Sequence, residues 1–119
     1  MRDPYRLRVT TAAEDLAVLT YEATSRFPRD ERFGLVSQMR RAAVSIGSNI
    51  CEGCGRGSDR AFMPFVHQSN GSANELEFQA HLSRRLSFGA PEEITALLDG
   101  TYAFKRQLSR LIVTLQRRL

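Results

Sequence analysis

The chain has 119 residues, of which 42% are hydrophobic and 25% are charged, as is ordinary for a folded domain that buries its core without disulfides or metals. Its net charge is +4, and Lys105 is the one lysine among 17 basic residues, so the other 16 are arginine. No apolar run reaches the roughly 18 residues of a membrane span and the N-terminal stretch lacks the apolar core of a signal peptide, so we expect a cytoplasmic protein with reduced thiols and no membrane partner.

The first helix is expected to follow an irregular N-terminal segment, residues 1–10, which contains Pro4. Thr11 and Glu14 have the spacing of a capping box, in which the two side chains satisfy free N–H groups at a helix start. Pro28 is expected to end the helix because the residue before a proline avoids the helical conformation. The apolar stripe comprises Ala12, Leu16, Leu19, Ala23 and Phe27.

The second helix is predicted to start near Asp30 or Glu31 and to run to about Cys54. Its apolar residues recur at steps of three and four, which is typical of a helix packed on other helices. They are Val36, Met39, Ala43, Ile46 and Ile50. Three glycines are expected to break this helix and to adopt positive φ angles, namely Gly53, Gly55 and Gly57.

The third helix is predicted to be capped by Ser58, with Asp59 in its first turn and Gly89 closing its C-terminal end. Pro64 falls in the first two turns, where the missing N–H costs less than it does in mid-helix. The predicted inner face comprises Phe62, Phe65, Val66, Ser69, Ala73, Leu76, Ala80 and Leu86.

The fourth helix is predicted to open at Pro91, because proline suits the first helical position and the following Glu92 and Glu93 suit the positive end of the helix dipole. Gly100 is a local weakness of about 1 kcal/mol relative to alanine. The predicted seam comprises Ile94, Leu97, Leu98, Tyr102, Leu108, Leu111, Ile112, Leu115 and Leu119.

Four amphipathic helices with short connections and no strand-like alternation predict an all-α fold, an antiparallel up-down four-helix bundle. We expect residues 1–119 to form this bundle as a single domain.

A polar stripe is predicted on the second helix, on nearly the opposite side from its apolar seam. Its members are Gln38, Arg41, Ser45, Asn49 and Glu52. The plainest interpretation is a strip that faces solvent. The short side chains of Ala42, Ala43 and Gly47 nevertheless make the helix thin, so the stripe is also a candidate interface with another subunit or another helix through hydrogen bonds.

The same helix carries a recognisable sequence pattern. Its parts are Phe27-Pro28, Glu31 to Leu35, Ser37 to Ile46, Ser48 to Ile50, Glu52-Gly53 and Gly55-Arg56, and then Phe62, Phe65, Gly71-Ser72, Glu75 to Glu77 and Pro91 to Glu93. Over nearly the whole chain past residue 12, this pattern resembles the ribosomal-RNA intervening-sequence protein family, also called four-helix bundle proteins.

The resemblance implies a small all-α bundle assembled as a ring-like homopentamer. Some family members are encoded inside intervening sequences of large-subunit ribosomal RNA, and a related branch, the accessory variability proteins of diversity-generating retroelements, acts with a reverse transcriptase and its RNA. The implied partners are therefore further copies of the chain and a nucleic acid or nucleic-acid-processing protein. This chain departs from the family pattern at Gly47, where proline is usual, and at Cys51 and Cys54.

Cys51 and Cys54 form a C-x-x-C pair, and His67 follows at the spacing of a zinc finger. His81 is too far along the same predicted helix to join His67 at one ion, and a helix precedes Cys51 where a finger has a β-hairpin. The pair also lies at a helix C-terminus, where the dipole does not favour a reactive thiolate. We expect no metal and no cofactor, and we interpret the cysteines as small hydrophobic side chains, with a metal or redox role as the alternative hypothesis.

The sequence has no phosphate-binding loop, nucleophile elbow or paired catalytic carboxylates, so we expect no enzymatic activity. The turn at residues 55–58 leads into a helix N-terminus and could bind an anion, although a turn with an N-cap is the simpler interpretation.

Arginine is well suited to phosphate, which makes nucleic acid the most specific functional hypothesis. Six arginines are predicted to form a basic band across the second and third helices: Arg40, Arg41, Arg56, Arg60, Arg84 and Arg85. In the first hypothesis they contact backbone phosphates of RNA or DNA in an accessory protein. The plainer interpretation of the arginines is that they form salt bridges with Glu52, Glu75 or Glu77 and pack in interfaces. The second functional hypothesis is a structural or protein-interaction scaffold whose ring presents a surface to a protein partner.

Overall fold

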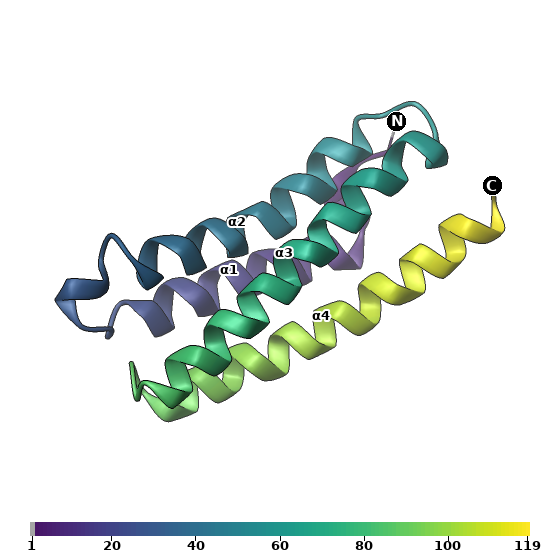
Figure 1. Cartoon of the computed structure of the whole chain (residues 1–119). Helices are drawn as coiled ribbons and strands as arrows, with labels where there is room; N and C mark the ends of the chain where they lie inside the picture. The colour runs from purple at the N-terminus through teal and green to yellow at the C-terminus, as the bar shows by residue number, and fades with distance from the viewer. Residues whose placement is uncertain (1) are drawn as a thin grey trace.

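The computed structural model describes residues 2–119, which form four α-helices, two short 3-10 helices and no strand (Figure 1). The α-helices are α1 (Arg8–Thr24), α2 (Leu35–Cys54), α3 (Asp59–Arg85) and α4 (Pro91–Arg117). The 3-10 helices are η1 (Pro4–Arg6), before α1, and η2 (Arg29–Glu31), between α1 and α2. The predicted all-α class is confirmed.

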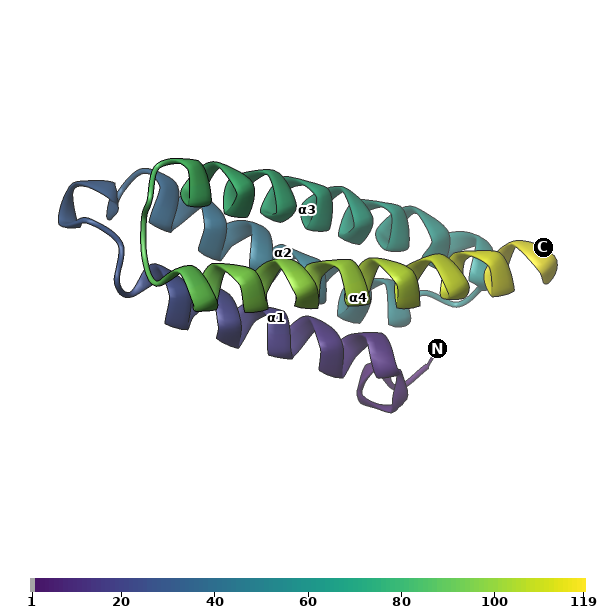
Figure 2. The ribbon, with the colours of Figure 1, turned by 90° about the horizontal axis from the view of Figure 1, so that it is seen from below.

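The helices run alternately up and down along one long axis (Figure 2). α1 and α3 each contact both α2 and α4, and within residues 2–119 no contact crosses either diagonal of the bundle. The Cα atoms extend over 45 × 22 × 20 Å. The predicted antiparallel up-down four-helix bundle is confirmed, because the short connections place sequential helices side by side. None of the helices in the described part is long and apolar enough to cross a membrane.

The core runs along the axis of the bundle and takes side chains from all four α-helices. Every residue of the seam predicted for α2 is buried, because the alternating three- and four-residue steps keep it on one side of the helix. Leu16 of α1, Phe62 of α3 and Phe104 of α4 are among the largest fully buried side chains of the same core. Each such side chain contributes about 1.5–3 kcal/mol by leaving water.

The start of α1 differs from the prediction. The helix begins at Arg8, upstream of the predicted cap at Thr11, and Leu7 occupies the N-cap position without a side-chain hydrogen bond. The preceding 3-10 turn sets this start, since the N–H of Leu7 donates to the carbonyl of Pro4 (3.0 Å). Thr11 and Glu14 lie inside the helix as exposed residues. The predicted capping box is therefore wrong, and residues 8–10, which were predicted to be irregular, belong to α1.

The buried face of α1 is more polar than the predicted stripe. Leu16, Ala23 and Phe27 are buried as predicted, whereas Ala12 and Leu19 are half-buried. The remaining buried positions are Val9, Thr10, Ala13, Thr20 and Thr24. The two last threonines bury their hydroxyls by donating to the carbonyls of residues 16 and 20 (both 2.7 Å), which removes the cost of an unpaired polar group.

The connection between α1 and α2 is longer than predicted. α1 ends at Thr24, before Pro28 can act on it, and α2 begins at Leu35 and not at Asp30 or Glu31. The 3-10 helix η2 fills the interval. The carboxylate of Glu31 accepts a hydrogen bond from the N–H of Leu35 (3.3 Å), so it satisfies one free donor at the start of α2.

The glycines at the end of α2 do not adopt the predicted positive φ angles. Among the described residues, positive φ occurs only at Ser87 and Gly89. Gly53 lies inside α2 and is buried. A Cβ at this position would stand 2.6 Å from Cδ1 of Phe62 and 2.8 Å from Cβ of Phe65, so this glycine permits the close approach of α3.

The start of α3 agrees with the prediction and its end does not. Ser58 is the N-cap, its Oγ accepting from the N–H of Ala61 (3.1 Å). At the other end, the left-handed residue that closes the helix is Ser87 (φ 59) and not Gly89. The N–H of Phe88 donates to the carbonyl of Ser83 (3.0 Å), which is the Schellman pattern.

The inner faces of α3 and α4 agree with the prediction over most of their length. On α3, Leu86 is exposed and Phe65 is half-buried, while unpredicted burial occurs at Met63, Gln79 and Ser83. α4 begins at Pro91 as predicted. Its seam differs from the prediction in three ways. Tyr102 and Leu119 are exposed, and Leu111 and Ile112 are only half-buried. Thr101 and Phe104 are buried although they were not predicted to be.

Candidate nucleic-acid interface

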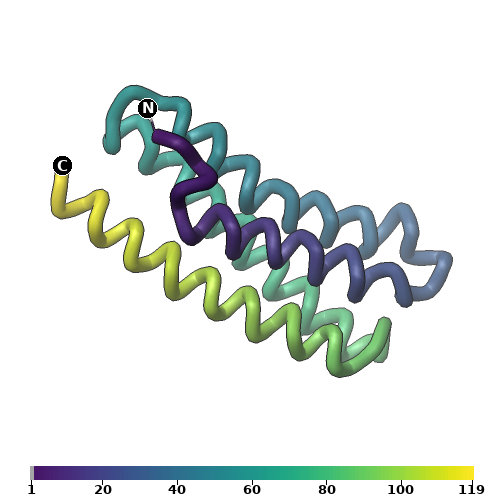
Figure 3. Tube along the Cα trace, turned by 180° about the vertical axis from the view of Figure 1, so that it is seen from behind, coloured from purple at the N-terminus to yellow at the C-terminus, as the bar shows by residue number. Residues whose placement is uncertain are grey.

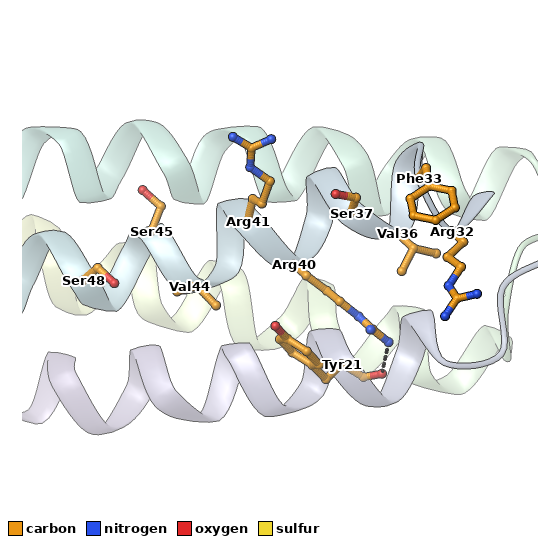
Figure 4. Close-up of a pocket in the computed structure, with 10 residues that line it drawn as sticks. All are labelled: Tyr21, Arg32, Phe33, Val36, Ser37, Arg40, Arg41, Val44, Ser45 and Ser48. Atoms are coloured by element: carbon orange, nitrogen blue, oxygen red, sulfur yellow. Dashed lines mark hydrogen bonds between the residues drawn. The ribbon is translucent and has the colours of Figure 1, made fainter.

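A groove of about 750 Å³ lies along the outer side of α2 where it meets α1 (Figure 4). We call it the α1–α2 groove. Its lining comprises arginines, aromatic rings, serine hydroxyls and two valines, with no carboxylate among the lining residues. They are Tyr21, Arg32, Phe33, Val36, Ser37, Arg40, Arg41, Val44, Ser45 and Ser48.

Arg40 is held against α1 by three contacts. Its Nε donates to Oγ1 of Thr24 (3.0 Å), and its Nη2 donates to the carbonyl of Tyr21 (3.5 Å). The guanidinium carbon lies 4.5 Å from the centre of the Tyr21 ring, a cation–π contact. Figure 4 shows the Arg40 side chain reaching from α2 to α1 beside this ring. The guanidinium is thus fixed in place at the groove before any ligand arrives.

Phe33 projects into solvent at the end of the groove, in the turn between η2 and α2. Its side chain is 89% exposed, the highest value among the large exposed hydrophobic residues. The guanidinium of Arg32 lies 5.6 Å from the ring centre. Glu31 already provides the side-chain contact at the start of α2, so the Phe33 ring has no evident part in holding the turn or the core.

A second hollow, of about 400 Å³, adjoins the groove around the α1–α2 connection. It shares Arg32, Val36 and Arg40 with the groove and adds Arg29. Together the two hollows are lined by four arginines, at positions 29, 32, 40 and 41, and neither lining includes an aspartate or a glutamate. Neighbouring positive charges without an acidic partner attract phosphate.

The predicted basic band is not a single surface. Arg40 turns toward α1, whereas Arg41 points to the other side of α2, toward α3 (Figure 4). Adjacent residues stand about 100° apart on a helix, which separates the two side chains.

The other arginines of the predicted band lie near the two ends of the bundle. Arg56 donates to Oε1 of Glu52 (3.3 Å), a salt bridge of the kind that the scaffold hypothesis expects, and its guanidinium lies over the ring of Phe65. Arg84 donates to Oγ1 of Thr95 on α4 (3.1 Å). Arg60 and Arg85 are exposed. The six arginines therefore lie in separate parts of the fold, and their contact with phosphate stays a prediction.

The predicted polar stripe of α2 borders α3 at its centre. Oγ of Ser45 is hydrogen-bonded to Oγ of Ser72 on α3 (2.9 Å). Asn49 donates to the carbonyl (2.9 Å) and to Oγ (3.1 Å) of Ser45. The Asn49 contacts stay within α2, whereas the Ser45–Ser72 hydrogen bond joins the stripe to another helix of the same chain, which is one of the two interfaces considered from the sequence. Gln38, Arg41 and Glu52 are exposed.

A further groove, the α2–α3 groove, has a volume of about 490 Å³. Its lining residues are Leu35, Gln38, Arg41, Glu75, Phe78, Gln79 and Leu82. Phe78 is 66% exposed, whereas Gln79 is only 4% exposed. Nε2 of Gln79 donates to Glu75 (3.4 Å), but its buried Oε1 has no hydrogen-bond partner. An unpaired buried acceptor costs about 1–3 kcal/mol, which a donor from a partner at this groove would recover.

The cysteines are positioned as hydrophobic residues. Cys54 is 1% exposed, as predicted for a small buried side chain, and Cys51 is half-buried. Burial raises the pKa of the Cys54 thiol above its ordinary value, although the charge of Arg2 opposes this. His81 is exposed and its Nε2 is hydrogen-bonded to the Tyr102 hydroxyl (2.8 Å). Across residues 2–119, no group of three His, Cys, Asp or Glu side chains is arranged to hold a metal ion.

A charged cluster closes the end of the bundle where both termini lie (Figure 3). Asp59, at the start of α3, is paired with Arg2 and with Nε of Arg118 (2.9 Å). The backbone N–H of Arg2 donates to the carbonyl of Cys54 (3.0 Å), and its guanidinium lies over the Phe62 ring. Burial alone would raise the pKa of Asp59, but the hydrogen bond from Arg2 and the charge of Arg118 outweigh it and lower the pKa.

Several of these residues were not singled out from the sequence. In the Asp59 cluster, Arg2 is 57 positions and Arg118 is 59 positions from Asp59 in the sequence. No local sequence pattern indicates contacts over such separations. Phe33 did carry a usable signal, because it is a large apolar residue outside every predicted seam and is flanked by Arg32 and Gly34. Tyr21 carried none, since its role depends on which residue of α2 packs over it.

Comparisons with known proteins agree with this architecture. A family model described as 23S rRNA-intervening sequence protein matches residues 5–110. The chain is similar to a crystal structure of a protein of unknown function from the S23 ribosomal protein family of Bacteroides thetaiotaomicron, with 22% identity and a TM-score of 0.77 over 87% of this chain and 97% of that chain. At this identity the likeness concerns the fold alone. No curated protein matches the chain.

Proposed function

Because this chain belongs to the 23S rRNA-intervening sequence protein family, we propose that it is a non-enzymatic, homo-oligomeric accessory protein that binds RNA through the backbone phosphates. The observation that carries the proposal is the set of three arginines around the α1–α2 connection, Arg29, Arg32 and Arg40, where no lining residue is acidic. Arg40 is already held there by Tyr21 and Thr24, so its side chain would lose little further conformational entropy when it contacts a phosphate.

Assembly would strengthen this attraction. The net charge of one chain is +4, so five copies would carry 5 × 4 = +20 on one particle. The resemblance of the sequence to its family supports the pentamer. The α2–α3 groove supports an interface between copies, because it combines an exposed phenylalanine, Phe78, with the unpaired buried acceptor of Gln79.

The proposal is tested by the binding of a labelled RNA hairpin between 50 and 200 mM salt, followed by fluorescence anisotropy. We expect binding at 50 mM, and a fall in the logarithm of the affinity that is linear in the logarithm of the salt concentration. Arg32→Ala should reduce the slope by about 1, whereas Arg106→Ala, at an exposed site on α4, should leave it unchanged. Absence of binding at 50 mM, or binding indifferent to salt, contradicts the proposal.

The oligomeric state is measured on the same samples by light scattering. One chain has a mass of 13.4 kDa, so a pentamer would have a mass of about 5 × 13.4 = 67 kDa. A monomeric mass at all protein concentrations would contradict the homo-oligomer.

The second candidate function is a protein-interaction scaffold without a nucleic-acid ligand. The α2–α3 groove is the observation that favours it, since Phe78 and the unpaired Gln79 would suit a different protein as well as a second copy. Partners that remain bound in a pull-down after nuclease treatment, combined with no RNA binding by the purified protein, would favour the scaffold.

A further inference from the structure

We propose that the α1–α2 groove binds an unpaired segment of nucleic acid, with one base stacked on Phe33 and a neighbouring base on the guanidinium of Arg40. This inference rests on the proposed function and deepens it. Phosphate contacts alone do not distinguish a duplex from a single strand. Stacking on protein side chains does, because it requires bases that are not already stacked on neighbouring bases in a double helix.

Phe33 is the first element of this site. An aromatic side chain that is 89% exposed gives up the roughly 1.5–3 kcal/mol that burial of such a ring provides, so folding gains little from its presence. The turn is held by other groups, since Gly34 donates its N–H to the carbonyl of Glu31 (3.1 Å) and the Glu31 carboxylate contacts the start of α2. The ring is therefore free to contribute its face to a ligand.

Arg40 provides the second stacking surface. The carbon of its planar guanidinium lies over the Tyr21 ring, 4.5 Å from the ring centre, and its hydrogen bonds to α1 hold the group there. Because Arg40 also lines the groove, a base can stack on the guanidinium from the side opposite to the tyrosine. Bases stack on arginine planes as well as on aromatic rings in single-strand recognition.

The charge around the two stacking surfaces suits the sugar–phosphate backbone. Arg29 and Arg32 line the hollows beside them, together with the hydroxyls of Ser37 and Ser48. A second copy of this chain, or a neutral protein surface, would have to bury these guanidinium groups without a carboxylate from the groove, which is costly. A single-stranded nucleic acid supplies both phosphates for the arginines and exposed bases for the two stacking surfaces.

The dimensions of the groove also fit a short strand. From Val36 to Ser48 the groove follows α2 for twelve residues, or about 18 Å at 1.5 Å per residue. At about 3.4 Å per stacked nucleotide, this length accommodates on the order of five nucleotides.

The test compares a labelled twelve-nucleotide oligo-U RNA, the oligo-dU DNA of the same length and a blunt twelve-base-pair RNA duplex, all at 50 mM salt. Phe33→Ala should weaken binding of the single strands roughly 5- to 100-fold and leave duplex affinity unchanged. Tyr5→Ala removes an exposed aromatic ring that lies outside both the α1–α2 groove and the α2–α3 groove, and it should change none of the affinities. The tighter of the two single-stranded probes shows which sugar the site prefers, and a Phe33-dependent loss with either one supports the inference.

Other outcomes separate this inference from the function on which it rests. Salt-dependent RNA binding that Phe33→Ala leaves unchanged would overturn the stacking site while the proposed function stands. A wild-type protein that binds the duplex but neither single strand would do the same. If Phe33→Ala instead lowers the molecular mass in light scattering with no specific loss of single-strand binding, Phe33 is a contact between copies and the inference is wrong. Failure of every nucleic acid to bind would remove the proposed function itself.

Discussion

Gly53 illustrates how much of the packing between α2 and α3 depends on single atoms. The backbone conformation at this position does not require glycine, because Gly53 has no positive φ. What excludes a larger residue is the Phe62 ring, whose Cδ1 and Cε1 atoms would stand 2.6 and 2.9 Å from an added Cβ. Phe62 is fully buried, so its ring cannot move aside without disturbing the core.

We therefore predict that Gly53→Ala lowers the free energy of unfolding by about 1–3 kcal/mol, despite the better helix propensity of alanine. Gly47→Ala is the matched control in the same helix. Its added Cβ would meet only Cβ of Ala13 at 3.5 Å, an ordinary contact, so stability should be unchanged or higher by up to about 1 kcal/mol. Urea unfolding at one fixed protein concentration measures both, and equal midpoints for the two variants would refute the steric argument.

At the scale of an element, the end of α3 has a left-handed backbone conformation at a serine, a residue that seldom adopts it. Ser87 has φ 59 and lies in the left-handed region that favours glycine, while Gly89 follows with φ 73. Gly89 is needed for a second reason, since a Cβ there would stand 2.8 Å from Cε1 of Phe27. The ring of Phe88 packs against the same Phe27, with centroids 5.6 Å apart.

The two positions should consequently respond in opposite ways to substitution. Ser87→Gly relieves the left-handed strain and is expected to raise stability by up to about 1 kcal/mol, the gain being reduced by the greater freedom of glycine in the unfolded chain. Gly89→Ala introduces the same strain together with a steric clash and should destabilise by more than 1 kcal/mol. Thermal unfolding followed by circular dichroism would measure both effects, and a lower melting temperature for Ser87→Gly would contradict the first.

At the scale of the whole molecule, the Asp59 cluster joins segments that are far apart in the sequence. Arg2 from the N-terminal segment and Arg118 beyond the end of α4 both meet Asp59 at the start of α3. Arg2 also contacts the end of α2 through the carbonyl of Cys54. One carboxylate thus links three of the four α-helices of the described chain to the N-terminal segment.

The lowered pKa of Asp59 makes this link dependent on pH. A carboxylate whose pKa is lower in the folded than in the unfolded state stabilises the fold above its ordinary pKa of about 3.9, and this contribution disappears as the pH falls through the folded value. We expect Asp59→Asn to melt at a lower temperature than the wild type at pH 7. The gap should narrow progressively as the pH falls below about 4, where the carboxylate becomes protonated.

A control for this prediction is Glu52→Gln, which breaks the exposed pair with Arg56 and should have a smaller effect at pH 7. A gap between wild type and Asp59→Asn that stays constant down to pH 2 would show that the charge of Asp59 is not responsible.

The candidate site was only partly accessible from the sequence. The abundance of arginine pointed to phosphate, and Arg40 and Arg41 were predicted to belong to a basic surface on α2. The sequence could not show that Arg40 turns toward α1 and Arg41 toward α3, because that depends on where the neighbouring helices lie. For the same reason Arg29, Arg32 and Phe33 were not connected with Arg40, although all of them line the two hollows around one connection.

The sequence by itself determined the helical class, the antiparallel order, the seam of α2, the cap at Ser58 and the start of α4, since each of these rests on local spacing or on the chemistry of one residue. The tertiary structure decided the polar part of the core, where Thr20 and Thr101 are buried because their hydroxyls reach backbone carbonyls one turn earlier. It also decided the close approach at Gly53, the Asp59 cluster and the grouping of basic and aromatic residues beside α1. These features depend on contacts between segments distant in the chain, and such contacts exist only once the helices have packed.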